Sequence, residues 1–63
     1  MHLMKWLNSF ESTKEIIVRE MYSSELLYKG SVNNVPKELT AREVEHVASL
    51  RGDIPVFILK EDI

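Results

Sequence analysis

The stretch IPVFIL, at positions 54–59, is the most continuously apolar part of this 63-residue sequence. A short apolar run rich in β-branched and aromatic residues is typical of a strand in the middle of a sheet. Pro55 cannot donate a hydrogen bond to a neighbouring strand, so we expect it near the start of this one. The other elements are predicted from their ability to pair with residues 54–59 or to cover them.

Two earlier segments have the pattern of a β-hairpin. Residues 14–21 and 25–31 contain most of the β-branched and aromatic side chains in this part of the chain, and the sequence between them has the length of a turn. Gly30, near the end of the second segment, is predicted to mark a bulge or a close approach of the backbone to another group.

Alternation along the two strands separates one side of the hairpin from the other. The side chains expected to share a face are Ile16 with Val18, Ile17 with Arg19, Leu26 with Tyr28, and Leu27 with Lys29. One face of each strand is more apolar than the other, which suits a sheet that is covered on one side only.

An amphipathic helix is predicted before the hairpin. Leu3, Trp6, Leu7 and Phe10 are spaced as one face of a helix over residues 2–10. A helix of two to three turns is not stable alone, so we expect this face to cover the sheet.

The segment after the hairpin begins with a short helix and then allows two interpretations. Pro36 is tolerated in the first turn of a helix, which predicts a helix at 36–39. Thr40 and Glu43 form a capping box, which predicts a further helix over 41–51. The alternative is a strand with Val44, His46, Ala48 and Leu50 on one face, followed by a turn at 51–53.

Positions between 14 and 59 follow the outline of a loose group of small phage and prophage proteins from Gram-positive bacteria. The residues that carry this resemblance are Leu27, Tyr28, Lys29, Gly30, Ser31, Val32, Val35, Pro36, Leu39, Arg42, Glu43 and Val44. In that group the arginine–glutamate–valine stretch opens a strand paired with the last one, so the resemblance favours a strand at 43–49. Small phage proteins often bind host factors, including CRISPR defence systems, so the resemblance implies a bacterial host.

Composition narrows the classes of protein. The 8 Lys and Arg residues are interleaved with 10 acidic residues for a formal net charge of −2, which disfavours direct nucleic-acid binding. There is no cysteine, and His2 and His46 are the only imidazoles, so neither disulfides nor a structural zinc site is expected. No apolar run is long enough to span a membrane and no signal-peptide pattern is present, so we expect a cytoplasmic protein.

Residues 1–63 are expected to form a single domain of marginal stability. Apolar burial contributes about 90 kcal/mol, and ordering the chain costs about 90 kcal/mol. Because disulfides and zinc are excluded, self-association is the remaining common source of stability, and we expect a homo-oligomer.

No pattern of residues indicates catalysis, a metal site or a cofactor. His46 has neither a nucleophile nor an orienting acid in a recognisable arrangement, so a surface or half-buried histidine is expected. Glu43 and Glu45 are not part of a loop that brings several oxygen ligands together, as a divalent cation would require. The Arg-Gly-Asp sequence at 51–53 is interpreted as a turn. We therefore expect no enzymatic activity.

The hairpin supplies the candidate partner-binding residues. Tyr22 is the aromatic residue most expected to be exposed, and with Met21 it would form an anchor for a protein partner. Arg19 and Lys29 add basic side chains to this candidate site. Lys14, Arg19 and Lys29 could instead lie with Tyr28 on one sheet face and form a small nucleic-acid platform.

The sequence predicts an α+β fold: an N-terminal helix, a β-hairpin, a short helix and a second β-hairpin (or a helix plus strand), forming one small antiparallel sheet. The expected function is non-enzymatic binding of a host protein or protein–nucleic-acid complex, as a phage-encoded inhibitor or modulator of a defence nuclease. The alternative is a small oligomeric nucleic-acid-binding protein.

Overall fold

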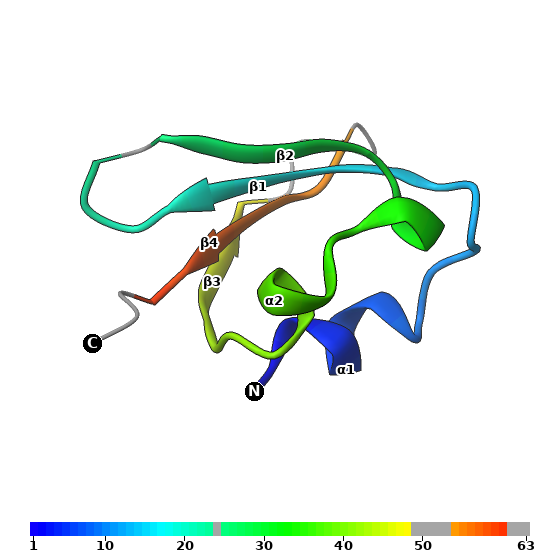
Figure 1. Ribbon diagram of the computed structural model, residues 1–63, viewed down its shortest axis with the longest axis horizontal. Coiled ribbons are helices and arrows are strands. Elements are labelled where there is room, and N and C mark those ends of the chain that lie inside the picture. Colours follow the sequence, from blue (N-terminus) through cyan, green and yellow to red (C-terminus); the bar gives the residue numbers. More distant parts are fainter. Residues whose placement is uncertain (24, 49–53, 61–63) are drawn as a thin grey trace.

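The computed structural model describes residues 1–23, 25–48 and 54–60 and has an α+β architecture (Figure 1). The elements in chain order are α1 (Leu3–Leu7), β1 (Glu15–Glu20), β2 (Leu26–Ser31), the 3-10 helix η1 (Val32–Asn34), α2 (Lys37–Thr40), β3 (Val44–Ala48) and β4 (Val56–Leu59). The predicted α+β class and the order helix, hairpin, short helix, strand are confirmed. The first helix is shorter than the predicted 2–10 span.

The four strands form a mixed sheet in the order β2-β1-β4-β3. β1 is antiparallel to β2, and β3 is antiparallel to β4, but β1 and β4 are parallel. The predicted all-antiparallel sheet is therefore wrong. Each antiparallel pair is formed by strands that follow one another, and the two pairs meet through β1 and β4, which run in the same direction.

The core lies between the sheet and the two helices, which are on the same side of it (Figure 1). Its fully or nearly buried members are Leu3, Leu7, Ile16, Val18, Leu39, Val44, Phe57 and Leu59. Trp6 and Phe10 pack against this cluster while remaining half-buried. The prediction that the N-terminal helix covers one face of the sheet is confirmed.

β4 is the strand on which the core is built, as the apolar run predicted. It lies between β1 and β3, and Pro55 precedes its first residue, where the Pro55 carbonyl accepts a hydrogen bond from the Ile17 amide at 3.0 Å. Phe57 and Leu59 are buried, while Val56 and Ile58 are only half-buried. The strand is therefore central but covered on one face.

A register shift in the first hairpin changes which residues share a face. Ile17 pairs with Lys29 and Val18 with Tyr28, but Arg19 pairs with Leu26, so Leu27 is the extra residue of a bulge. Leu26 consequently faces the same side as Lys29 and is exposed, while Leu27 packs against the core. Ile16 and Val18 share a face, as predicted. The predictions that Leu26 shares a face with Tyr28, and Leu27 with Lys29, are wrong.

The segment after α2 is a strand, as the resemblance indicated, and the predicted helix over 41–51 is wrong. The Thr40 hydroxyl donates a hydrogen bond to the Lys37 carbonyl at 2.7 Å within α2, so Thr40 does not cap a following helix. A second register shift, between Val44 and His46, buries Val44 and turns His46 outward. Val44 and His46 therefore do not share a face as predicted, and Leu50 and the turn at 51–53 lie outside the described residues.

Gly30 provides the predicted close approach. A Cβ atom at this position would lie 2.7 Å from the Tyr28 hydroxyl oxygen, which is closer than real Cβ contacts. That hydroxyl donates a hydrogen bond to the Ser31 carbonyl at 2.6 Å. The absence of a side chain at Gly30 thus lets the Tyr28 ring lie back along its own strand.

Phe57 is the residue whose truncation should damage the fold most. It is fully buried, and its ring makes edge contacts with the rings of Trp6 and Phe10 at centroid distances of 6.2 and 6.0 Å. Phe57→Ala should lower the free energy of unfolding by about 3–5 kcal/mol, against a total of about 3–9 kcal/mol expected for this length. Circular dichroism with urea denaturation should show a largely unfolded variant.

Phe57→Leu is the matched control because it retains most of the apolar volume. It should remain folded with a loss of about 1–2 kcal/mol. Equal stability of the wild-type protein and Phe57→Ala would contradict the placement of this ring at the centre of the core.

Candidate functional site

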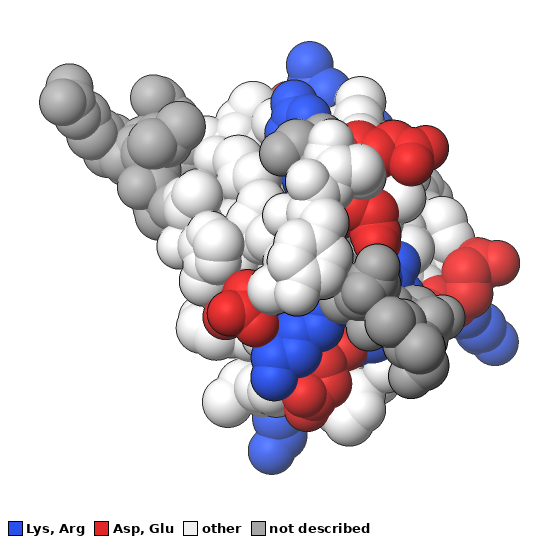
Figure 2. Space-filling view, turned by 90° about the vertical axis from the view of Figure 1, so that its left-hand side faces the viewer, with Lys and Arg blue, Asp and Glu red and all other residues white. Residues whose placement is uncertain are grey.

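The tip of the β1–β2 hairpin carries an exposed aromatic side chain. Tyr22 has 72% of its surface accessible, and Met21 beside it is half-buried. The predicted exposure of Tyr22 is confirmed. Figure 2 looks onto this end of the molecule and shows a broad uncharged surface flanked by acidic and basic side chains.

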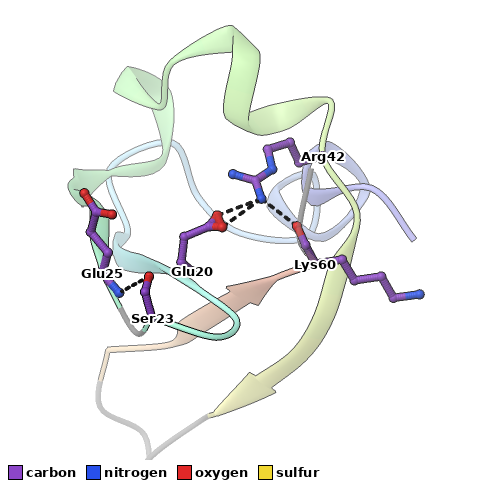
Figure 3. A network of polar contacts seen from close by, with 5 residues as sticks. All are labelled: Glu20, Ser23, Glu25, Arg42 and Lys60. Carbon is purple, nitrogen blue, oxygen red and sulfur yellow. Dashed lines mark hydrogen bonds and ion pairs between the residues drawn. The ribbon is translucent and has the colours of Figure 1, made fainter. Parts of the chain in front are cut away.

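The hairpin tip is closed by its own polar groups (Figure 3). The Glu20 amide donates to the Glu25 carbonyl at 2.9 Å, and the Glu25 amide donates to the Ser23 hydroxyl at 3.2 Å. These bonds satisfy backbone groups of Glu20 and Glu25, on the two sides of the tip where the ladder ends.

Arg42 connects the end of β1, next to the hairpin tip, to the residue that follows β4 (Figure 3). Its Nη2 lies 2.7 Å from Glu20 Oε1 in an ion pair, donates a hydrogen bond to Glu20 Oε2 at 3.2 Å, and donates to the Lys60 carbonyl at 2.5 Å. Glu20 Oε1 accepts no hydrogen bond, so the 2.7 Å contact is an ion pair only. Both side chains are largely buried, with 15% and 21% of their surface exposed.

The side of the sheet that faces away from α1 and α2 bears two rows of four side chains. The strand registers place Lys29, Ile17, Val56 and Ala48 in one row, and Leu26, Arg19, Ile58 and His46 in the next. We call these eight residues the open face. Five of them are apolar, and Arg19 makes a further interaction within the chain. The pairing of Glu15 with Ser31 places an exposed carboxylate on the same side of the sheet, one row beyond Ile17.

The predicted partner-binding residues therefore occupy two neighbouring surfaces. Tyr22 and Met21 belong to the hairpin tip, whereas Arg19 and Lys29 lie in adjacent rows of the open face. Leu26, which is 49% exposed and belongs to the open face, was not among the predicted residues. Leu26 and Leu27 are two adjacent apolar residues, which interrupt the alternation of apolar and polar side chains at the start of the strand. This interruption in the sequence could have indicated the bulge.

The predicted nucleic-acid platform is not assembled. Tyr28 pairs with Val18, whose side chain is buried in the core, while Lys29 pairs with Ile17 on the open face. Tyr28 packs against the core cluster, and its hydroxyl bonds to Ser31. The aromatic surface that base stacking would require is thus on the opposite side from Arg19 and Lys29.

Other candidate chemistry is sparse in the described part of the chain. No three residues among His, Asp and Glu come together there in a way that could hold a metal ion. His46 is an exposed member of the open face, as predicted. None of the helices in residues 1–23, 25–48 and 54–60 is long and apolar enough to cross a membrane.

The first residues of the chain run beside the start of β3. The Leu3 amide donates to the Arg42 carbonyl at 2.9 Å, and the Val44 amide donates to the Met1 carbonyl at 3.0 Å. Glu43, at the centre of this contact, lies 3.5 Å from both the Met1 ammonium and the Lys60 ammonium. The positive charge of the Met1 ammonium, followed by that of Lys60, lowers the pKa of the Glu43 carboxyl.

Comparison with known proteins finds no relative of this chain. The chain matches no protein-family model, and no curated protein or solved structure is significantly similar to it. The functional argument therefore depends on the surfaces themselves.

Removal of the Arg42–Glu20 pair should destabilise the protein through a measurable coupling. Arg42→Met keeps the aliphatic stem but leaves the Glu20 carboxylate without its partner, and should cost about 2 kcal/mol. Glu20→Gln should cost about 1 kcal/mol. Urea denaturation of the two single variants and the double variant should give a coupling energy of about 1 kcal/mol. Strict additivity would show that the pair contributes nothing as a unit.

Glu43 should make stability pH-dependent in acid. Its pKa is lower in the folded chain than in the unfolded chain, so its ion pairs stabilise the fold fully above about pH 4.5. That contribution is lost as the pH falls through the lower folded-state pKa. Thermal melts from about pH 6 to about pH 3 should show a shallower decline for Glu43→Gln than for the wild-type protein.

Salt provides the control, because the Glu43 pairs are exposed. In about 0.5 M NaCl the difference between Glu43→Gln and wild-type protein should shrink. Parallel pH profiles at low salt would contradict the ion pairs.

Proposed function

We propose that this protein is a non-enzymatic protein-binding module whose anchor is the hairpin tip. The observation that carries the proposal is the 72% exposure of Tyr22, two residues after Glu20, whose amide donates a hydrogen bond to the Glu25 carbonyl across the two strands. Exposed tyrosines with restricted geometry are common hot spots, because they bury a large area for little loss of side-chain entropy.

The tip is supported in a way that suits binding. Glu20 ends β1 directly before the turn, and its carboxylate is held by Arg42, which also bonds to the Lys60 carbonyl. The end of β1 next to the tip is therefore held by Arg42, which is itself bonded to the residue after β4. A preorganised anchor loses less conformational entropy when a partner binds.

The partner we propose is a host protein or protein–nucleic-acid complex in the bacterial cytoplasm. The resemblance to small phage proteins supports this setting, and a defence nuclease of the CRISPR type is the leading candidate for the complex. The net charge of −2 supports such a role, since an acidic protein can associate with the basic surface of a nuclease.

A small nucleic-acid-binding protein is the second candidate function. The neighbouring positions of Arg19 and Lys29 on the open face favour it. The position of Tyr28 on the opposite side, against the core, argues against base stacking there. Binding through phosphates alone would weaken steeply as the salt concentration rises.

The test is the retention of a partner by variants of two exposed apolar residues. A C-terminally tagged protein is used for capture from a Gram-positive bacterial lysate, with and without nuclease, so that the Met1 ammonium still pairs with Glu43. Tyr22→Ala should weaken binding of the captured protein at least about 30-fold, corresponding to a hot-spot loss of about 2 kcal/mol. Titration calorimetry with the purified partner measures this change.

Met4→Ala is the matched control. Met4 is also a large exposed apolar side chain, with 54% of its surface accessible, but it lies on α1. This variant should bind as the wild-type protein does. Equal binding by Tyr22→Ala, or recovery of nucleic acid with no host protein in the captured material, would overturn the proposal.

A further inference from the structure

The amino end of the chain is joined to the start of β3, beside which it lies in Figure 1. The Leu3 amide donates a hydrogen bond to the Arg42 carbonyl at 2.9 Å, and the Val44 amide donates one to the Met1 carbonyl at 3.0 Å. We call this pair of bonds the N-terminal bridge. It leads directly into the core, because the Leu3 side chain is fully buried. The amino end is therefore tied down, whereas most chain ends are poorly ordered.

Two cations flank the carboxylate next to this bridge. The Met1 ammonium lies 3.5 Å from Glu43 Oε2, and the Lys60 ammonium lies 3.5 Å from Glu43 Oε1. The Met1 ammonium is the larger cause of the lowered pKa of the Glu43 carboxyl, and Lys60 is the next. Of the two cations, that of Met1 belongs to a residue whose backbone is part of the bridge.

We propose that the Met1 α-amino group is a modification site at which acylation weakens the N-terminal bridge. Acylation converts the ammonium into a neutral amide. Glu43 then keeps Lys60 as a partner but loses the cation that ties its side chain to the first residue. This inference concerns a different site from the hairpin tip and does not depend on the proposed function.

The substrate class for this modification is an acyl thioester. The Met1 ammonium first gives one proton to solvent, and the nitrogen lone pair then attacks the carbonyl carbon of the thioester. A C–N bond forms and the C–S bond breaks, and the departing thiolate takes a second proton from the nitrogen. The Met1 side chain is more than half exposed, which gives a thioester access to the amino group.

The bridge is adjacent to contacts that join three strands. Arg42, whose carbonyl accepts the Leu3 amide, pairs through its guanidinium with Glu20 at the end of β1. The Glu43 carbonyl accepts a hydrogen bond from the Lys60 amide at 2.9 Å, directly after β4. Acylation of the amino end therefore acts where β3 is joined to β1 and to the end of β4. In a small cooperative domain, such a local loss lowers the stability of the whole fold.

The first test compares full-length synthetic chains with a free, an acetylated and a methylated amino group. Methylation adds bulk but keeps the positive charge, so it is the matched control. At an ionic strength of about 20 mM, acetylation should lower the Tm by about 2 °C, because the lost ion pair is an exposed one. Methylation should change the Tm by less than about 0.5 °C. An equal loss in the acetylated and methylated chains would contradict the role of the charge.

The carboxyl of Glu43 gives a readout that a general change in stability would not move. NMR titration should give a higher Glu43 pKa in the acetylated chain than in the free and methylated chains, because acetylation removes the Met1 cation. In Glu43→Gln, acetylation should lower the Tm by less than about 0.5 °C, because the partner of the cation is already absent. Circular dichroism verifies that this variant folds.

The reaction itself is tested on the folded wild-type chain. Incubation with a small acetyl thioester at neutral pH, followed by peptide mass spectrometry, should locate an acetyl group on Met1. The absence of acetylation at Met1 would overturn the inference. So would an acetylated chain with an unchanged Tm, a Glu43 pKa that acetylation does not raise, or an equal loss of Tm in Glu43→Gln. Partner binding by Tyr22→Ala bears on none of these outcomes, so the two proposals fail separately.

Discussion

The parallel pairing of β1 with β4 is the interaction on which the rest of the structure depends. An isolated two-stranded hairpin is at best marginally stable in water, and this chain contains two of them. Their junction places Val18 beside Phe57, so that both hairpins contribute to one apolar layer. Leu3 and Leu7 of α1 and Leu39 of α2 all pack against this layer. The sheet order, the core and the two-row open face all follow from this single junction.

The parts of the fold that depend on near neighbours along the chain were predictable. The spacing of Leu3, Trp6, Leu7 and Phe10 identified the covering helix, and the apolar run at 54–59 identified the central strand. Those patterns record which side chains face the core, and facing is a local property of a helix or strand. The capping box at Thr40 gave a wrong prediction of a helix, because the Thr40 hydroxyl donates a hydrogen bond to the Lys37 carbonyl inside α2.

The features that depend on how the strands pair could not be predicted from local sequence patterns. Leu26 changes face because a bulge opposite Arg19 shifts the register, and His46 turns outward at a second bulge in β3. The direction in which β1 meets β4 depends on contacts between segments far apart in sequence. The exposure of Tyr22 was predictable because it depends only on its position between two neighbouring strands. The assembly of the open face and the role of Arg42 were not predictable, because they depend on contacts between distant segments.

The separation of positions 17 and 56, the first partners of the central junction, also bears on how the chain folds. Each hairpin can form from contacts that are close in sequence, but the junction closes a loop that contains β2, α2 and β3. Folding rates fall as such non-local contacts dominate, because the entropy of closure is lost before the contacts form. We therefore expect this small protein to fold more slowly than its length suggests, with both hairpins present before the sheet is complete.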